Sequence, residues 1–350
     1  MKVTSMPGLP SGRSGTDDYD PATLADVARV AGVSPATASR VLTGSLRVRQ
    51  QNIEKVQQAV TRLGYVRNRA APATGRRPGA IALVYCEEAA KTFVDPFFAR
   101  MVSNLYRTLI AADQQLILLT LNSPREYKSV SRYLRAGHVD GALLVSMHST
   151  RDFDFAGLDI PLVLCGRPVN GGEDLSYVDA DNVGGARMAV AYLIDSGRKA
   201  IATIAGPRDM SPGLDRLLGY RKAMTAVGVS DPGLIAYGDF GIVSGEHAMY
   251  RLIDHRPNLD AVFAASDLMA AGALRALRRL GRRVPDDVAV IGFDDTPLAQ
   301  HTDPRLSTVR QAVDAMAAQM ASELLAIIAS PRSEPIHMVL DTELILRDSA

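Results

Sequence analysis

Residues 24–42 constrain the fold more than any other stretch, because they show the pattern of two short amphipathic helices joined by a tight turn. Apolar side chains recur at helical spacing up to Ala31, and Gly32 follows, a residue that takes a positive φ without steric cost. Ser34 then supplies an oxygen for the unpaired N–H groups at the start of a second helix, and Pro35 brings a preset φ to its first position. This arrangement predicts a helix-turn-helix that binds DNA, with an ordinary small helical hairpin as the alternative.

The charge of the chain supports DNA binding by this end. Residues 20–77 hold ten Lys or Arg and three Asp or Glu, a net charge of +7, whereas residues 1–19 hold two of each sign. Since the whole chain carries +1, residues 78–350 carry −6. A basic end on an acidic body fits phosphate binding by that end alone, with an affinity for DNA that falls as salt rises.

The rest of the composition excludes several classes of protein. No apolar run approaches the roughly 20 residues of a membrane span. Residues 1–19 are rich in Gly, Ser, Pro and Asp, so we expect a disordered leader and a cytoplasmic protein. Cys86 and Cys165 lie in apolar runs and are expected to be buried thiols. The six histidines lack metal-ligand spacing, and no phosphate loop or nucleophile motif occurs, so we expect no metal, no cofactor and no enzymatic activity.

Beyond residue 80, short apolar runs alternate with helical patterns, which is typical of parallel sheets flanked by helices. Strands are expected at 81–85, 115–121, 141–145, 162–164, 201–205, 261–265 and 288–292, and helices from residues 97, 126, 182 and 267 and through residue 220. This α/β pattern predicts two lobes of doubly wound parallel sheets, whose sites form at the carboxyl ends of the strands.

Residues 24–43, a third helix at 52–65 and Asn68 closely resemble the DNA-binding headpiece of the lactose-repressor family. Further family-like segments recur in order downstream, at 95–99, 139–142, 181–182, 216–220, 266–270, 292–295, 306–309 and 344–347. The resemblance implies a ligand-responsive transcriptional regulator, a repressor of a metabolic operon, with an all-α headpiece and a two-lobed core of the periplasmic-binding-protein type. A small-molecule-binding protein of that type without a DNA role is the alternative, which the headpiece argues against.

The same resemblance divides the chain into a leader (1–19), a headpiece (20–66), a hinge (67–79) and a core (80–350). The N-terminal lobe is expected at about 80–179 and 311–338, and the C-terminal lobe at about 180–310 and 339–350. In family members that bend their operator, a hinge leucine enters the minor groove. Thr74 stands at that position here and Pro72 removes a helical hydrogen bond, so we expect weaker bending.

The resemblance also assigns a set of DNA-contacting residues: Leu24, Ser34, Pro35, Ala36, Thr37, Ser39, Arg40 and Asn68. Arg40 matches the family's recognition-helix arginine, whose guanidinium can donate to O6 and N7 of guanine at once. A phosphate contact or a solvated surface arginine is the alternative. Pro35 and Ala36 match base-reading positions, whereas the hydroxyl side chains and Asn68 suit phosphate contacts.

In the core, the resemblance assigns a set of ligand-contacting residues: Asp95, Phe97, Phe98, Arg167, Arg216, Phe240, Ser266, Asp267 and Asp294. An arginine, an acid and a ring suit a compact polar effector such as a sugar or a base. The alternatives are an ion pair between lobes for Arg216 and Asp294, and a place in the core for Phe98 and Phe240. Gly166 and Ser266 replace an aspartate and an asparagine of the sugar-binding pattern, which weakens the case for a sugar.

We expect the partners to be double-stranded operator DNA, a small-molecule effector and a second copy of the chain, with no membrane. One headpiece reads only half of a pseudo-palindromic operator, which requires a homodimer. No leucine heptads of the kind that join two dimers follow residue 347, so we expect no tetramer. The sequence leaves open whether the effector is an inducer or a co-repressor.

Overall fold

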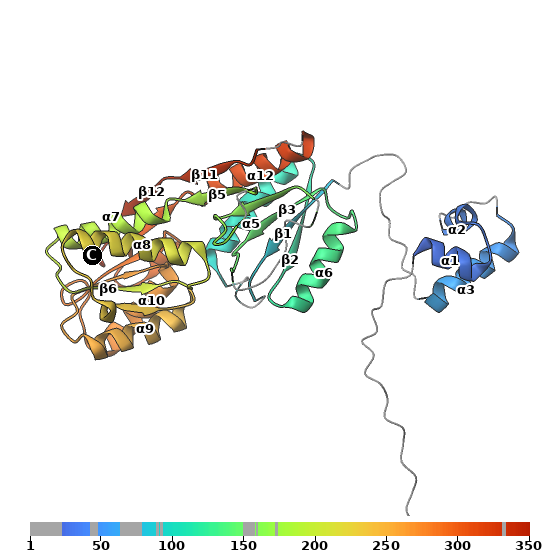
Figure 1. Cartoon of the computed structure of the whole chain (residues 1–350). Helices are drawn as coiled ribbons and strands as arrows, with labels where there is room; N and C mark the ends of the chain where they lie inside the picture. The colour runs from blue at the N-terminus through green and yellow to red at the C-terminus, as the bar shows by residue number, and fades with distance from the viewer. Residues whose placement is uncertain are drawn as a thin grey trace, which may run out of the picture. The chain divides into compact units, whose positions relative to one another are not determined.

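The computed structural model describes residues 23–42, 48–63, 79–88, 91, 94–149, 158, 160–171, 174–330 and 334–350. The chain divides into two compact units, residues 1–69 and 70–350 (Figure 1). The expected leader, Asn68 and the hinge positions Pro72 and Thr74 lie outside the described residues. Within the described ranges, no helix is long and apolar enough to cross a membrane.

The first unit contains three helices, α1 (Leu24–Ala31), α2 (Pro35–Leu42) and α3 (Gln50–Leu63). Thr23 and Asp26 form a capping box at the start of α1, which satisfies backbone N–H groups that lack a helical partner. Gly32 ends the helix with φ = 64°. At the start of α2, Ser34 Oγ accepts from the backbone N–H of Thr37 at 3.2 Å. The turn and the cap therefore form as the sequence predicts.

A small apolar core holds these three helices together, and it consists of Val27, Ala28, Ala31, Ala38, Val56 and Ala59. The buried residues of α1 and α3 recur at helical spacing, and α2 contributes Ala38. The third helix begins two residues before the predicted start at Asn52. The helix-turn-helix prediction is confirmed.

The N-terminal lobe of the second unit is a six-stranded parallel sheet in the order β11-β5-β4-β3-β1-β2. Its strands are β1 (Ala80–Tyr85), β2 (Gln115–Thr120), β3 (Gly141–Val145), β4 (Leu162–Cys165), β5 (Ser176–Ala180) and β11 (His337–Leu340). Helices α5 (Pro96–Ala111) and α12 (Val313–Ala329) pack on one face of this sheet, and α6 (Pro124–Arg135) packs on the other.

The C-terminal lobe is a second six-stranded sheet, in the order β12-β10-β9-β8-β6-β7, with only β12 antiparallel to its neighbour. Its strands are β6 (Ile201–Ala205), β7 (Ile235–Tyr237), β8 (Ala261–Ala264), β9 (Ala289–Asp294), β10 (Ser307–Gln311) and β12 (Thr342–Ile345). The helices are α7 (Asn182–Asp195) and α8 (Ser211–Ala226) on one face, α9 (Ile242–His255) and α10 (Asp267–Arg279) on the other, and the short η2 (Pro232–Leu234) and α11 (Pro297–His301).

The chain passes from one sheet to the other three times: after β5, after β10 and between β11 and β12 (Figure 1). Helices cover both faces of both sheets, as a doubly wound α/β fold requires. The predicted fold class is confirmed. In such a fold, the carboxyl ends of the parallel strands are the expected place for a ligand.

Candidate functional site

The second helix of the helix-turn-helix presents one face to solvent. Ser34, Pro35, Ala36 and Arg40 are exposed and Thr37 and Ser39 are partly exposed, whereas Ala38 lies in the core with no exposed surface. Leu24 is half-buried against that core. The outward residues of α2 are thus small except for Arg40, which gives a close-fitting surface with one long cationic side chain. That shape suits insertion into the major groove.

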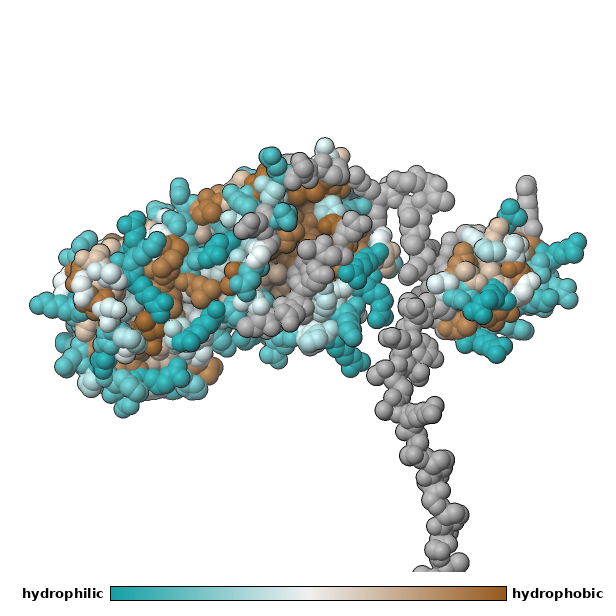
Figure 2. Space-filling model, viewed as in Figure 1, coloured by the Kyte–Doolittle hydropathy of each residue, from teal (hydrophilic) through white to brown (hydrophobic). Residues whose placement is uncertain are grey.

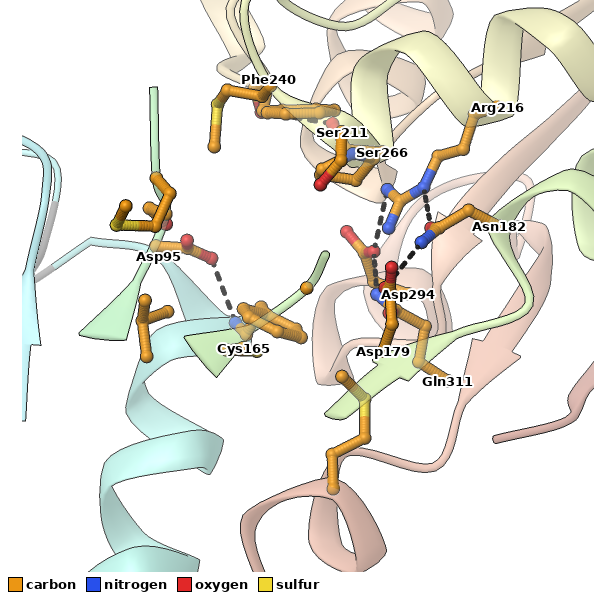
Figure 3. Close-up of a pocket in the computed structure, with 18 of the residues that line it drawn as sticks. Asp95, Cys165, Asp179, Asn182, Ser211, Arg216, Phe240, Ser266, Asp294 and Gln311 are labelled. Carbon is orange, nitrogen blue, oxygen red and sulfur yellow. Dashed lines mark hydrogen bonds and ion pairs between the residues drawn. The ribbon is translucent and has the colours of Figure 1, made fainter. Parts of the chain in front are cut away.

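A cavity lies between the two lobes of the core, at the carboxyl ends of the strands (Figure 3). Together with the open space at its mouth, it comprises about 780 Å³. The N-terminal lobe contributes Asp95, Phe97, Val145, Ser146, Met147, Cys165, Gly166, Asp179 and Met316 to its lining. The C-terminal lobe contributes Asn182, Met210, Ser211, Pro212, Arg216, Phe240, Ser266, Leu268, Asp294 and Gln311.

Arg216 is the polar centre of the C-terminal side of the cavity (Figure 3). Only 5% of its surface is exposed. Nε donates to Asn182 Oδ1 at 2.8 Å, and Nη1 donates to the backbone oxygen of Ala265 at 2.6 Å and to Asp294 Oδ1 at 3.2 Å. Burial lowers the pKa of the guanidinium, and the surrounding carboxylates, led by Asp294, oppose that shift. Because its donors converge on these neighbours, the guanidinium is fixed in place.

Three carboxyl groups, those of Asp95, Asp179 and Asp294, face the same cavity. Burial raises the pKa of each, and that of Asp294 rises to about 8 although Arg216 opposes the shift. Gln311 Nε2 donates to Asp294 Oδ1 at 2.7 Å. Among the described lining residues, Arg216 is the one cationic side chain. The cavity therefore carries more acidic than basic groups.

The other two carboxyls are held by hydrogen bonds from the backbone and from neighbouring side chains. Asp95 caps α5 by accepting from the N–H of Phe97 at 2.9 Å, and it accepts from the Tyr85 hydroxyl at 3.2 Å. Asp179 accepts from Asn182 Nδ2 at 2.9 Å. Figure 3 shows Asp179, Asn182, Arg216, Asp294 and Gln311 gathered on one side, with Asp95 across the cavity.

Two phenylalanines supply aromatic surface to the lining, Phe97 at the start of α5 and Phe240 in the loop before α9. Phe240 has φ = 66°, and its ring packs so closely on Gly206 that a Cβ there would lie 2.4 Å from Cζ. Ser146 (φ = 60°) and Asp294 (φ = 115°) also line the cavity, so three of the five described non-glycine residues with positive φ belong to this site. Backbone strain of this kind gathers at functional sites.

The structure brings six of the nine expected ligand contacts into the lining: Asp95, Phe97, Arg216, Phe240, Ser266 and Asp294. The other three lie elsewhere. Phe98 is 3% exposed and packs in the core with its ring centre 3.9 Å from that of Tyr85. Asp267 is fully buried and accepts from the N–H of Thr296 at 2.7 Å. Arg167 Nε donates to Asp215 Oδ2, across the lobes, at 3.0 Å.

Sequence reasoning did not assign Asn182, Ser211 or Gln311 to the ligand site. Asn182 and Ser211 stand at the first position of a helix, and Gln311 ends a strand. The available signal was positional: a polar residue directly after or at the end of an apolar run in an α/β fold.

Both units of the chain match known protein families. Residues 23–68 match the family model of bacterial regulatory proteins, lacI family, and residues 190–350 match the periplasmic binding protein-like domain. Over 336 residues the chain is 46% identical to the HTH-type transcriptional regulator CelR of Thermobifida fusca, an alignment that covers 93% of this chain and 98% of that protein. The chain belongs to the lacI family.

Other members of the lacI family align over similar lengths. The ribose operon repressor of Halalkalibacterium halodurans is 30% identical over 330 residues, covering 93% of this chain and 96% of the repressor. The solved structure of a CelR–cellobiose complex matches with a TM-score of 0.75 and 44% identity, covering 94% of this chain and 100% of that chain. A lacI-family regulator from Chloroflexus aggregans matches with a TM-score of 0.68 and 30% identity, covering 78% and 98%.

The lacI-family membership decides between the alternatives left by the sequence. The chain is a DNA-binding transcriptional regulator with an effector-binding core, and not an enzyme. A binding protein without a DNA role is not favoured, because the relatives that match nearly the whole chain are regulators and repressors. The predicted family and function are confirmed.

Proposed function

We propose that this regulator binds a pseudo-palindromic operator as a homodimer in the cytoplasm and that a neutral saccharide of the cellobiose type controls its affinity for DNA. The observation that carries the proposal is the interlobe cavity, which combines three carboxyl groups, one fixed arginine and two phenylalanine rings. It occurs in a chain that aligns over 94% of its length with the CelR–cellobiose complex.

The lining has the chemistry that a saccharide requires. Carboxylate oxygens accept from hydroxyl groups, the Arg216 guanidinium donates to hydroxyl oxygens, and the rings of Phe97 and Phe240 can cover the apolar C–H face of a pyranose. Gly166, with φ = 86°, leaves space at a point where a Cβ would lie 3.5 Å from Ser211 Oγ and 3.9 Å from Asp179 Oδ1. A larger side chain there would occupy part of the cavity, so the glycine leaves that space to a ligand.

The acidic excess of the cavity predicts discrimination against anionic sugars. We expect cellobiose to bind and cellobionate, its carboxylate derivative, to bind at least about tenfold more weakly, because a further negative charge must be buried near Asp95, Asp179 and Asp294. Because the pKa of each carboxyl is raised, lowering the pH protonates these groups and reduces the repulsion. The difference in affinity between cellobiose and cellobionate should therefore narrow as the pH falls from 8 towards 5.

Titration calorimetry on the full chain tests this, with maltose as a control that has the same two glucose units in a different linkage. Equal affinity for cellobiose and cellobionate at every pH would contradict the assignment of a neutral ligand. Failure of all three sugars to bind would contradict a saccharide effector of the cellobiose type.

The dimer proposal is supported by apolar side chains on the surface of the N-terminal lobe. Tyr106 and Ile110 on α5 are 52% and 42% exposed, and Leu118 on the edge strand β2 is 36% exposed. Hydrophobic patches are visible among hydrophilic surface in Figure 2. Exposed apolar groups on adjoining elements suit burial against a second copy.

Light scattering at micromolar concentration measures this assembly directly. We expect a mass of two 37.5 kDa chains. Tyr106→Lys together with Ile110→Lys should shift the mass towards one chain and weaken operator binding, since each headpiece would then bind a half-site alone. A tetramer, or a dimer unaffected by the two lysines, would contradict the proposed interface.

A further inference from the structure

Ion pairs join the loops of the two lobes around the mouth of the cavity. In each pair the nitrogen-bearing side chain comes from the N-terminal lobe and the carboxylate from the C-terminal lobe. The three pairs are Lys91–Asp239 at 3.1 Å, His148–Asp209 at 2.9 Å and Arg167–Asp215, whose Nε–Oδ2 distance is 3.0 Å. We refer to these six residues as the rim. Since all three pairs span the lobes, each is made only when the lobes are closed.

The rim is separate from the cavity lining, although the two are adjacent in sequence. None of the six rim residues lines the cavity. His148 and Arg167 each follow a lining residue, Met147 and Gly166, and Asp209 and Asp239 each precede one. Four of the six rim residues therefore lie on the same segments as the lining, but a ligand in the cavity is contacted only by the lining.

His148 has the most specific geometry in the rim. Its Nε2 lies 2.9 Å from Glu87 Oε1 of its own lobe, and its Nδ1 lies 2.9 Å from Asp209 Oδ2 of the other lobe. Only the ring protonated on both nitrogens donates two such bonds. The backbone N–H of Ser149 adds a bond to the backbone oxygen of Asp209 at 2.7 Å. This segment thus connects the lobes through side chain and backbone together.

The three pairs differ in how deeply their side chains are buried. The side chains of His148 and Asp209 are 9% and 23% exposed, and those of Arg167 and Asp215 are 39% and 9% exposed. Lys91 and Asp239 are 42% and 52% exposed, and solvent-exposed pairs contribute little. The His148 and Arg167 pairs should therefore favour the closed core far more than the Lys91 pair does.

We propose that His148 and Arg167 are positioning residues that set the affinity of the core for its effector without contacting it. The proposal rests on effector binding in the interlobe cavity. When only the closed core binds tightly, the apparent dissociation constant equals the intrinsic one divided by the closed fraction. The rim pairs change the closed fraction and leave the contacts to the ligand unchanged. Loss of a rim pair should therefore weaken the binding of every effector by the same factor.

Titration of the full-length variants His148→Gln and Asp215→Asn with cellobiose and with a second, weaker saccharide tests the proposal. We expect each variant to bind both sugars about tenfold more weakly, with the ratio of the two affinities unchanged. Lys91→Gln removes a cation from the exposed pair and should change affinity less than about twofold. Phe240→Leu, within the lining, should change the ratio itself.

A second measurement does not depend on the identity of the effector. Spin labels on α6 and α9, one helix in each lobe, report the distance between the lobes in the ligand-free protein. We expect His148→Gln and Asp215→Asn to add a population at longer distance, and Lys91→Gln to leave the wild-type distribution. Circular dichroism checks that each variant is folded. If only one of His148→Gln and Asp215→Asn folds, that variant suffices for the comparison with Lys91→Gln.

The two measurements separate the rim from the saccharide assignment. If no sugar binds the wild type but the distances change as expected, the saccharide proposal fails and the role of the rim stands. Unchanged distances, unchanged affinities or a changed affinity ratio in His148→Gln and Asp215→Asn would each overturn the proposal for the rim.

Discussion

Arg216→Met is expected to abolish effector binding and to lower the free energy of unfolding by about 3–5 kcal/mol, since removing one partner of a buried ion pair leaves the other uncompensated. Arg216 is 5% exposed, and the carboxyl of Asp294 that it contacts is 13% exposed. The substitution also removes the donors to Asn182 and to the oxygen of Ala265. Chemical denaturation and calorimetric titration measure the two effects separately.

The double variant Arg216→Met with Asp294→Asn distinguishes stability from binding. It removes both charges, so we expect most of the lost stability to return while effector binding stays absent. The pH dependence follows from Asp294, whose raised pKa means that the folded state holds a proton that the unfolded state releases between about pH 4 and pH 8. Because Arg216 opposes the raised pKa of Asp294, that pKa should be higher still in the single variant, so the deficit should grow as the pH rises through about 8, where the wild-type carboxyl ionises.

A single Arg216→Met variant with wild-type stability would show that the ion pair contributes nothing to the fold. Wild-type effector affinity in that variant would remove Arg216 from the binding site. A deficit that shrinks as the pH rises would contradict the assignment of the buried charge to Asp294.

Arg40→Ala is expected to weaken operator binding by about 1–3 kcal/mol per half-site, and thus by roughly twice that in a dimer that occupies both half-sites. The reason is the loss of a bidentate contact to a guanine, which should also relax sequence preference at one base pair in each half-site. Fluorescence anisotropy on an operator selected in vitro, and on scrambled DNA of the same length, measures both effects.

Arg29→Ala is the matched control for charge. Arg29 lies on α1 of the same headpiece, is exposed and pairs with Asp26 at 2.7 Å. Its removal subtracts one positive charge and should affect operator and scrambled DNA alike. If Arg40→Ala also gives equal losses on both DNAs, Arg40 contacts a phosphate and does not read a base.

The headpiece was predictable from sequence because its signals are local. Gly32 takes the positive φ that the turn needs, and Ser34 accepts from the N–H of Thr37 within the same turn of helix. The alternation of apolar runs and helices likewise predicted the layers of both lobes, since each strand buried on both faces is a short continuous apolar run.

The cavity was only partly predictable, because its lining joins segments that are far apart in sequence. Phe97 and Phe98 are neighbours on α5, yet one lines the cavity and the other packs in the core. Successive helical residues point about 100° apart, and the sequence does not give the rotation of the helix against its sheet. Gly206 shows the same limit, because its role is to admit the ring of Phe240, 34 residues later.

Arg167 was expected to contact the ligand, and the structure places its guanidinium against Asp215 on α8. A charged residue directly after a strand in such a fold can face the cavity or the opposite lobe. The two outcomes differ by the conformation of one loop and by the position of a partner 48 residues away. The sequence pattern alone predicts neither the conformation of the loop nor the position of the partner.

The most direct test of the whole account is the affinity of the full-length protein for its operator with and without saturating cellobiose. The account predicts a change of at least about fivefold, because an allosteric effector couples to DNA through a coupling free energy of about 1–3 kcal/mol. It also predicts that Arg216→Met abolishes this change while the ligand-free protein still binds the operator. Binding of cellobiose to the core with no change in operator affinity would contradict the account.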